Sequence, residues 1–288
     1  MDVSHLAQCP EVAPTLCRDE AVDLPPHVHD LTIGWKRVDA QWSIGLGDGW
    51  QVGGSLPFDV RDVGVVYSLP DGSPYAPPYE DTHHRDERLA GPVDGVVVAR
   101  WYTRRERWAI GLEGGVTLPL GDTVENPWRL TALGQAHQHQ QLGTGTWNPV
   151  VGAEAATVGG RGGFLASTQV RLPFATNDEG YRAARTWTLS GGPTWRAHPR
   201  ALLTSAVEVT WNGPEQWEAL DHGGRSLVAG SGGVLVNAGT HLTVSAQGRV
   251  PVWQRLYEPE AAVSSEEGSF TERPLVSMGV TWSWSPAP

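Results

Sequence analysis

The sequence predicts an all-β protein, namely a transmembrane antiparallel up-and-down β-barrel of about 12 strands. Three observations predict it. Apolar residues alternate with small or polar ones through most of the chain, which is the period of a β-strand. Short and long connections alternate between these segments, as turns and loops do in an outer-membrane barrel. Many of the 14 tryptophans lie at segment ends, where an aromatic girdle would meet the membrane interface.

Composition excludes several classes of protein. The chain of 288 residues has a formal net charge of −11, whereas a nucleic-acid-binding protein usually presents a basic face. No apolar run approaches the roughly 18 residues that a membrane-spanning helix needs. Sustained apolar spacing of the helical kind is almost absent as well. The protein is therefore expected to consist of strands.

Three parts are expected along the chain. Residues 1–29 are polar and rich in proline, and they predict an extended periplasmic N-terminal arm. Residues 30–284 are expected to form the β-barrel, and residues 285–288 a short tail. Strands are expected in the alternating segments 30–36, 41–56, 60–69, 96–103, 107–118, 143–155, 163–172, 186–196, 201–211, 225–236, 240–252 and 275–284.

The connections between these segments differ in length in a regular way. Tight turns alternate with long polar segments over most of the chain. In an outer-membrane barrel the short turns face the periplasm and the longer loops face outward. We expect the loop from Pro70 to Pro92 to constrict the pore. The other long connections are 119–142, 173–185, 212–224 and 253–273.

The last segment, LVSMGVTWSW, indicates which side chains face lipid. Every second residue from Val276 to Trp284 is large and apolar, and the residues between them are small or weakly polar. Other segments carry charges of both signs at the intervening positions, which a dry core penalises heavily. We therefore expect the large residues to face lipid and the charged ones to face a wet lumen. A soluble β-sandwich is the alternative. Bacterial outer-membrane barrels also resemble one another in placing an aromatic residue at the end of the last strand, as Trp284 would.

The inward charges are the first candidate site. One interpretation is a constriction that guides ions or solutes. The other is an ion-pair network that closes and stiffens a narrow barrel. The residues are Lys36, Arg100, Glu113, Glu154, Arg171, Arg196, Glu208 and Arg249.

Paired histidines are the second candidate site. One pair is His27 and His29, and two further pairs lie in the long connections. Paired imidazoles near carboxylates suit Zn²⁺ or Cu²⁺. The alternative is hydrogen bonding by polar loop or lumen residues. The candidate metal ligands are His83, His84, His137 and His139.

The cysteines and the N-terminus bear on the compartment. Cys9 and Cys17 are expected to close a disulfide in an oxidising compartment, with free thiols as the alternative. The start of the chain shows no basic region followed by an apolar one, so no signal peptide is visible. The chain is then either cytosolic or begins after processing, and the barrel pattern favours processing.

Three segments resemble the outer-membrane transporter family named for the meta-pathway of phenol degradation. They are GLGDGWQVGGSLPF (Gly45–Phe58), HHRDERLAGPVDGVVV (His83–Val98) and LGTGTWNPVVGAEA (Leu142–Ala155). The resemblance implies a barrel in the outer membrane that takes up apolar or aromatic small molecules. It implies no catalytic residues, and the sequence has no G-x-S-x-G elbow, so no enzyme is expected.

The expected function is an outer-membrane channel or transporter for a small solute, through a narrow, charged lumen, in a Gram-negative bacterium. One alternative is a barrel whose histidine-rich loops bind a transition metal. The other is a structural barrel that anchors a partner complex. The expected partners are outer-membrane lipid and a small-molecule solute. A periplasmic or membrane protein is a further alternative.

Overall fold

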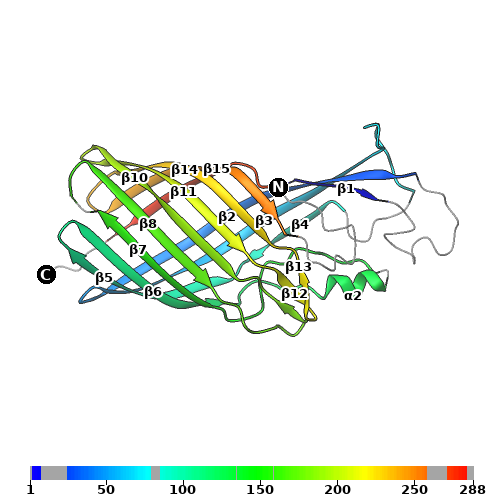
Figure 1. The fold of residues 1–288 in the computed structure, drawn as a ribbon, viewed down its shortest axis with the longest axis horizontal. Coiled ribbons are helices and arrows are strands. Elements are labelled where there is room, and N and C mark those ends of the chain that lie inside the picture. The colour runs from blue at the N-terminus through cyan, green and yellow to red at the C-terminus, as the bar shows by residue number, and fades with distance from the viewer. Residues whose placement is uncertain are drawn as a thin grey trace.

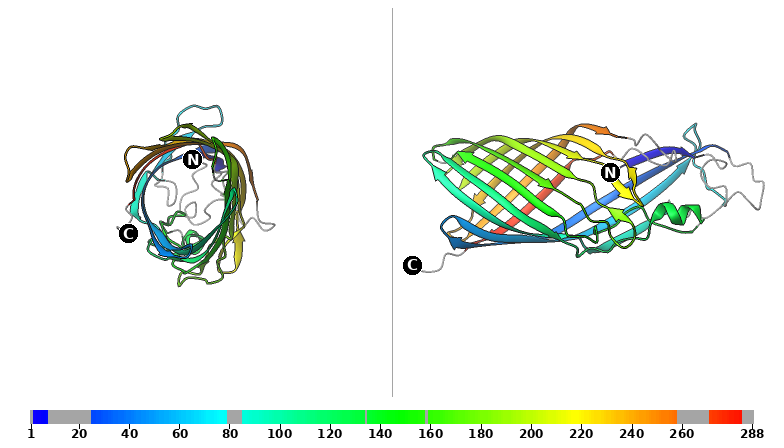
Figure 2. Two further views of the ribbon diagram at one scale, coloured as in Figure 1. Left: turned by 90° about the vertical axis from the view of Figure 1, so that its left-hand side faces the viewer. Right: turned by 60° about the horizontal axis from the view of Figure 1, so that its bottom comes forward.

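Strands make up most of the structure, a computed structural model that describes residues 2–7, 25–78, 85–133, 135–157, 159–257 and 271–283. One antiparallel sheet runs through twelve strands in the order β1-β2-β3-β5-β6-β7-β8-β10-β11-β14-β15-β16, with β4 beside β3. The sheet curls round on itself into a barrel (Figures 1 and 2). This confirms the predicted fold class. The strands are β1 (Asp2–Ala7), β2 (His27–Gly47), β3 (Trp50–Ser68), β4 (Glu87–Pro92), β5 (Gly95–Arg105), β6 (Trp108–Leu118), β7 (Pro149–Thr157), β8 (Gly162–Arg171), β10 (Thr186–His198), β11 (Ala201–Asn212), β14 (Arg225–Asn237), β15 (Leu242–Leu256) and β16 (Leu275–Trp282).

Smaller elements lie in the long connections. Strands β9 (Tyr181–Arg182), β12 (Glu215–Trp217) and β13 (Leu220–His222) form a separate three-stranded sheet. The short helix α2 (Pro127–Ala132) begins after Asn126, whose Oδ1 accepts a hydrogen bond from the backbone N–H of Trp128 at 3.0 Å. No helix in the described part of the chain is long and apolar enough to cross a membrane.

The outer face of the barrel wall is apolar. Trp101 on β5 lies opposite Leu112 on β6 and opposite Trp50 on β3, so the three side chains share one face. Leu112 is 53 % exposed and Trp50 is 50 % exposed. Lipid accepts such a surface, whereas water penalises it. Other exposed apolar side chains on the wall strands are Trp42, Ile44, Leu46, Leu56, Trp108, Ile110, Leu189, Val207, Val250, Val276, Met278, Val280 and Trp282.

Two strands continue far beyond the wall. β2 has 21 residues and β3 has 19, whereas β5 and β6 have 11 each. β5 pairs with β3 only along residues 50–55, and β4 pairs with β3 along residues 58–63. We call β1, β4, residues 27–37 of β2 and residues 58–68 of β3 the strand extension. It projects at the end of the barrel where α2 lies (Figure 1).

The apolar face of β2 and β3 reverses between the wall and the strand extension. In the wall Trp42 points outward, whereas in the extension Ile33 and its partner Val63 point inward, where they are 7 % and 9 % exposed. Lys36 and Asp62 lie on the outer face of the extension and form an ion pair at 3.2 Å. A strand that passes from lipid into water must exchange outward apolar residues for outward polar ones. The reversal therefore marks the level at which these strands leave the membrane.

The same reversal explains a difference from the prediction. The predicted segments 30–36, 41–56 and 60–69 are two long strands joined at Asp48 and Gly49. Because the apolar face changes within each strand, the alternating pattern in the sequence is interrupted there. One continuous strand therefore has the sequence pattern of two separate strands. The turn has positive φ angles of 50° at Asp48 and 82° at Gly49, and a Cβ at Gly49 would collide with the carbonyl oxygen of Tyr102.

A buried carboxylate lies at the level of the reversal. Asp59 is fully buried and accepts hydrogen bonds from Arg37 Nε at 2.6 Å and from Arg61 Nη2 at 3.0 Å. The Arg37 guanidinium also lies 4.7 Å from the ring centroid of Trp35. Arg61 Nη1 donates to the carbonyl oxygen of Gln141 at 3.1 Å. The cluster thus joins the two long strands to the connection between β6 and β7.

The two ends of the curled sheet are open edges. Within the described ranges, no ladder joins β16 to β1 or β2. β1 forms a strand within the segment predicted to be an arm, and the exact domain limits stay a prediction. Cys9, Cys17, Trp284 and the 285–288 tail lie outside the described residues, so the disulfide also stays a prediction.

Replacing Asp59 by asparagine should destabilise the barrel. Both guanidinium groups would lose their carboxylate partner, and breaking a buried ion pair costs about 3 kcal/mol. Urea unfolding of the detergent-folded protein, followed by tryptophan fluorescence, measures the change. Asp39→Asn is the matched control, because this carboxylate is on the inner face of the paired strand β2 but is exposed. Equal midpoints for the two variants would show that the Asp59 cluster does not hold the strands.

Candidate functional site

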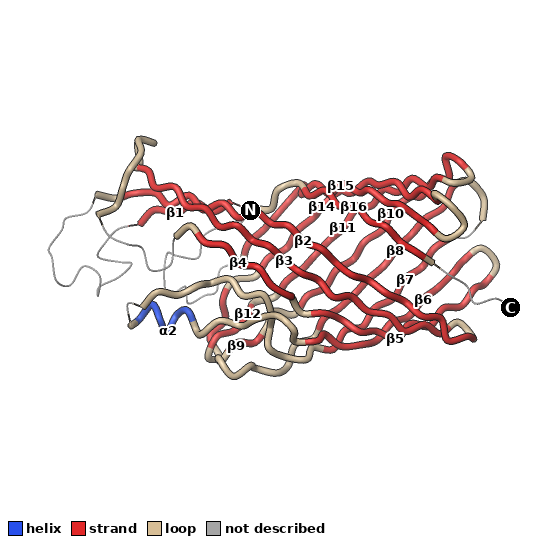
Figure 3. Tube along the Cα trace, turned by 180° about the vertical axis from the view of Figure 1, so that it is seen from behind, coloured by secondary structure: helices blue, strands red, loops and turns tan. Residues whose placement is uncertain are grey.

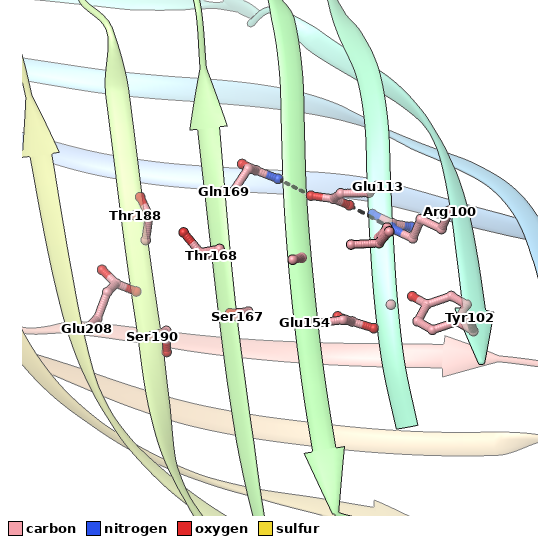
Figure 4. Close-up of a pocket in the computed structure, with 13 residues that line it drawn as sticks. Arg100, Tyr102, Glu113, Glu154, Ser167, Thr168, Gln169, Thr188, Ser190 and Glu208 are labelled. Carbon is pink, nitrogen blue, oxygen red and sulfur yellow. Dashed lines mark hydrogen bonds and ion pairs between the residues drawn. The ribbon is translucent and has the colours of Figure 1, made fainter. Parts of the chain in front are cut away.

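A cavity of about 460 Å³ lies inside the barrel. Its lining side chains come from β5, β6, β7, β8, β10 and β11, so one curved half of the wall supplies all of them. Figure 4 shows these side chains and the strands that carry them. The lining is polar and carries charges of both signs. The charged and polar residues are Arg100, Tyr102, Glu113, Glu154, Ser167, Thr168, Gln169, Thr188, Ser190 and Glu208.

A hydrogen-bonded chain on one side of the cavity joins residues of β5, β6 and β8 and passes over β7. Arg100 Nε on β5 donates to Glu113 Oε2 on β6 at 2.9 Å. Gln169 Nε2 on β8 donates to the other oxygen, Glu113 Oε1, at 2.8 Å (Figure 4). Gly152 of β7 lies beneath this chain, and a Cβ there would meet Glu113 Oε1 at 2.6 Å. Glycine at this position therefore gives the glutamate room to reach across β7.

Glu154 faces the cavity beside Tyr102 (Figure 4). Glu154 lies two residues from Gly152 on the same face of β7. Among the described residues it takes part in no ion pair, in contrast to Glu113 and Glu208. Its carboxylate is thus the lining charge that protein cations compensate least.

A second ion-pair network lies on the other side of the lumen. Arg249 on β15 contacts Glu208 on β11 at 2.7 Å and Glu272, just before β16, at 2.8 Å. Arg225 at the start of β14 also contacts Glu272, at 2.7 Å. These pairs link four strand regions whose backbones are not all neighbours. Arg249 and Glu208 belong to the predicted set of lumen charges, whereas Arg225 and Glu272 do not. Glu208 also lines the cavity.

Loops cover one end of the barrel. We call α2, residues 133 and 135–148, and strands β9, β12 and β13 the cap (Figure 1). Tyr181 and Trp217 are 7 % and 4 % exposed and pack against Trp128. The Tyr181 hydroxyl donates to Glu215 Oε2 at 3.0 Å. Thr144 Oγ1 donates to Asp94 Oδ2 at 2.6 Å, which ties the cap to the connection before β5.

The loop from Pro70 to Pro92 was predicted to constrict the pore, and residues 79–84 of it lie outside the described residues. Its last part, β4, pairs with residues 58–63 of β3 in the strand extension. Residues 135–148 instead lie against the inner face of the strand extension, where Arg61 holds Gln141. The cap is the part of the described chain that covers the mouth.

The structure separates the predicted lumen charges into groups. Arg100, Glu113, Glu154, Glu208 and Arg249 lie in the lumen at one level. Three others lie elsewhere: Lys36 is on the outer face of the strand extension, Arg171 is near the cap, and Arg196 is exposed beside the short turn between β10 and β11.

Sequence reasoning missed several of the charged groups. Five residues outside the predicted set form close ion pairs, namely Arg37, Asp59, Arg61, Arg225 and Glu272. Arg37, Asp59 and Arg61 lie where the predicted strand limits or apolar face differ from the structure, whereas Arg225 begins a strand whose start was predicted correctly. The alternation of Asp59 and Arg61 with Val60 was the signal that could have revealed two of them. Glu272 lies in a long polar connection, where no pattern distinguishes it.

The histidines form aromatic contacts in the described structure. His137 and His139 have ring centroids 5.0 Å apart, and Trp128 lies edge-on to His139 and stacks on His222 at 4.5 Å. His137 Nδ1 lies 2.8 Å from the carbonyl oxygen of Gln135. Among the described residues no three histidine, cysteine or acidic side chains gather as metal ligands. His83 and His84 lie outside the described residues.

Solved structures show the same type of fold. An outer-membrane channel from Pseudomonas putida F1 matches 97 % of this chain and 92 % of its own, with a TM-score of 0.57 and 11 % identity. OmpT, an outer-membrane protein of Vibrio cholerae, matches 90 % of this chain and 98 % of its own, with a TM-score of 0.40 and 11 % identity. No protein-family profile and no curated protein matches the sequence. The fold is therefore that of an outer-membrane β-barrel, while membership of a particular family is not shown.

The cap should loosen at alkaline pH. Burial, and then the adjacent Glu215 carboxylate, raise the pKa of Tyr181 above its ordinary value. Because this pKa is higher in the folded protein than in the unfolded chain, the contribution of neutral Tyr181 to the stability of the cap is complete below about pH 10. The contribution declines as the pH rises above that value. Limited proteolysis of the cap over a pH series measures this. Tyr181→Phe should remove the alkaline step, and an unchanged step in that variant would assign it to another group.

Proposed function

We propose that the protein is a non-enzymatic channel of the bacterial outer membrane that passes a small solute through a narrow, charged lumen. The carrying observation is a polar cavity enclosed by a wall whose outer face is apolar. The apolar face suits lipid, and the interior keeps charged groups in contact with water. The fold of the Pseudomonas channel supports the architecture and does not extend to its solute.

The lumen charges favour cationic or neutral polar solutes. The four charged residues that line the cavity are Arg100, Glu113, Glu154 and Glu208, with a formal sum of −2 from one positive and three negative groups. Arg100 neutralises Glu113, and Arg249 neutralises Glu208. Glu154 remains as the carboxylate that a passing cation or hydroxyl group would contact. A ring or cluster of carboxylates is the ordinary basis of cation preference in a pore.

The ion pairs also set the width of the lumen. Arg100, Glu113 and Gln169 extend inward from three strands and hold one another in place. Such a chain narrows the pore while leaving its wall polar. The two interpretations of the lumen charges are thus combined in this proposal: most of the charges stiffen the barrel, and Glu154 contacts the solute.

Membership of the phenol meta-pathway family is a further part of the proposal. The three segments that carry the resemblance occupy the β2–β3 hairpin, the entry into β5, and the entry into β7. Uptake of aromatic molecules in that family would require this lumen to pass an apolar ring. Tyr102 and the methyl groups of Thr168 and Thr188 are the lining groups that suit one.

Planar-bilayer recordings test the channel. The folded protein should give discrete conductance steps that favour potassium over chloride. Glu154→Gln should lower the cation-to-anion permeability ratio several-fold, because it removes the uncompensated carboxylate. Glu208→Gln is the matched control. Arg249, the ion-pair partner of Glu208, still pairs with Glu272 in this variant, so the change in permeability ratio should be smaller. Absence of conductance in folded, inserted protein would contradict the channel and favour the structural barrel with a protein partner.

A transition-metal site is the second candidate function. Arg85 Nη1 donates to the carbonyl oxygen of His137 at 3.2 Å, and His83 and His84 directly precede Arg85 in the sequence. The two histidine-rich connections thus approach one another at this contact. Together they offer four imidazoles, the ligands that Zn²⁺ and Cu²⁺ favour.

Thermal unfolding with and without Zn²⁺ or Cu²⁺ tests this alternative. If the histidines bind metal, the melting temperature should rise by several degrees with the metal, because a ligand that binds only the folded state stabilises it. The double variant His83→Ala/His84→Ala should lose the shift. The control is His198→Ala, which lies at the opposite, short-turn end of the barrel. A shift that survives the double variant would contradict this site.

A further inference from the structure

The two edge strands of the curled sheet run in the same direction. β2 and β16 are separated by ten ladders, and every one of these ladders is antiparallel. An even number of reversals returns the original direction. If β2 and β16 met directly, they would pair as parallel strands, unlike any other pair in the sheet. Figure 3 shows both edge strands from behind.

Both edges expose groups that lipid does not tolerate. In the described chain β16 pairs only with β15, and β2 pairs with β1 only along residues 27–32. Unpaired backbone N–H and C=O groups in hydrocarbon cost several kcal/mol each. Soluble proteins protect such edges with charges or proline, yet the sequence of β16, LVSMGVTW, contains neither. Its Met278 is 84 % exposed. The apolar, uncharged sequence of β16 is therefore typical of a strand that is paired on both sides.

β1 supplies the direction that such a partner strand needs. It runs antiparallel to β2, with Asp2 opposite Thr32 and Ala7 opposite His27. It occupies the free edge of β2 along residues 27–32 of the strand extension, and the pair Asp2 and Thr32 is the one nearest the wall. A strand that prolonged β1 beyond Asp2 would run antiparallel to β2 and to β16 alike. It would give both edges the pairing that the rest of the sheet has.

We propose that the seam between β2 and β16 is an acceptor site for one further β-strand, which continues β1 beyond Asp2 toward the short-turn end of the barrel. Apart from β1, the sheet path contains eleven strands, and one more makes an even number. Single-chain barrels of bacterial outer membranes have an even number of antiparallel strands. The proposal concerns the closure of the barrel and holds whether or not the lumen conducts.

The ladder of β1 with β2 specifies this strand. The numbers of the two residues in each pair of this ladder add up to 34, as for Asp2 and Thr32. In the same register, a continuation of about 14 residues before Met1 would extend the pairing along β2 as far as Gly47. Positions opposite Val38, Trp42 and Ile44 must be apolar, because these residues share the lipid-facing side of β2. Positions opposite Arg37 and its inward-facing neighbours must be small or polar. The acceptor site thus selects an alternating strand in one register.

An engineered extension tests the site. In a Cys9→Ser/Cys17→Ser background, 14 alternating residues are attached before Met1, with a cysteine at the position opposite Ile44. The extended protein should fold in detergent with a several-fold higher yield, measured by its heat-modifiable mobility on gels. Its cysteine should form a disulfide with Ile44→Cys and not with Ser43→Cys, whose side chain lies on the other face.

The matched control extension has the same residues with the alternation displaced by one position. It places its apolar side chains toward the lumen, so it should give neither the higher yield nor the disulfide. Equal yields for the two extensions would overturn the proposal. It would also be overturned if the unextended protein formed a direct disulfide between Ile44→Cys and a cysteine at Val276, Met278 or Val280. That bond would show that the two edges close the barrel by themselves.

Discussion

The requirement that every backbone polar group in lipid has a partner within the protein governs this structure. It explains why the wall is one continuous run of antiparallel ladders and why neighbouring strands are joined by tight turns at one end. It also makes the seam the critical part of the barrel. A sheet in water can end at an edge, whereas a sheet in lipid must return to its first strand. The direction of β1 is the one that our proposed closing strand would need.

The same physical boundary is visible within single strands. β2 and β3 pair without a break in register from Val28 to Gly45, yet their apolar side chains change faces near Arg37 and Asp59. In the wall the outer face of these strands meets lipid, and in the strand extension it meets water. The buried Asp59 lies where the inner face changes from the polar lumen to the apolar interior of the strand extension. Two arginines compensate its charge there, and one of them also holds the connection that forms the cap.

Charge inside the barrel serves mainly to hold strands together. Arg100 with Glu113, and Arg249 with Glu208 and Glu272, join positions that lie far apart in the sequence. Their side chains fill space that a soluble barrel would fill with apolar groups. Glu154 differs because, among the described residues, it forms no ion pair and lies beside Tyr102. This contrast between compensated and uncompensated carboxylates is the physical basis for a selective lumen.

The sequence by itself determined the strand content, the outward position of the large side chains and most of the lumen charges. It could do so because the two-residue period of a strand assigns each side chain to a face. It misplaced Lys36, because the apolar face of β2 reverses, and it could not find Glu272, because a long polar connection has no period. Which charges meet, which loop covers the mouth and where the seam lies were decided only by the tertiary structure. Those features depend on strand register and on the curvature of the sheet, and both arise from contacts between residues that are distant in the chain.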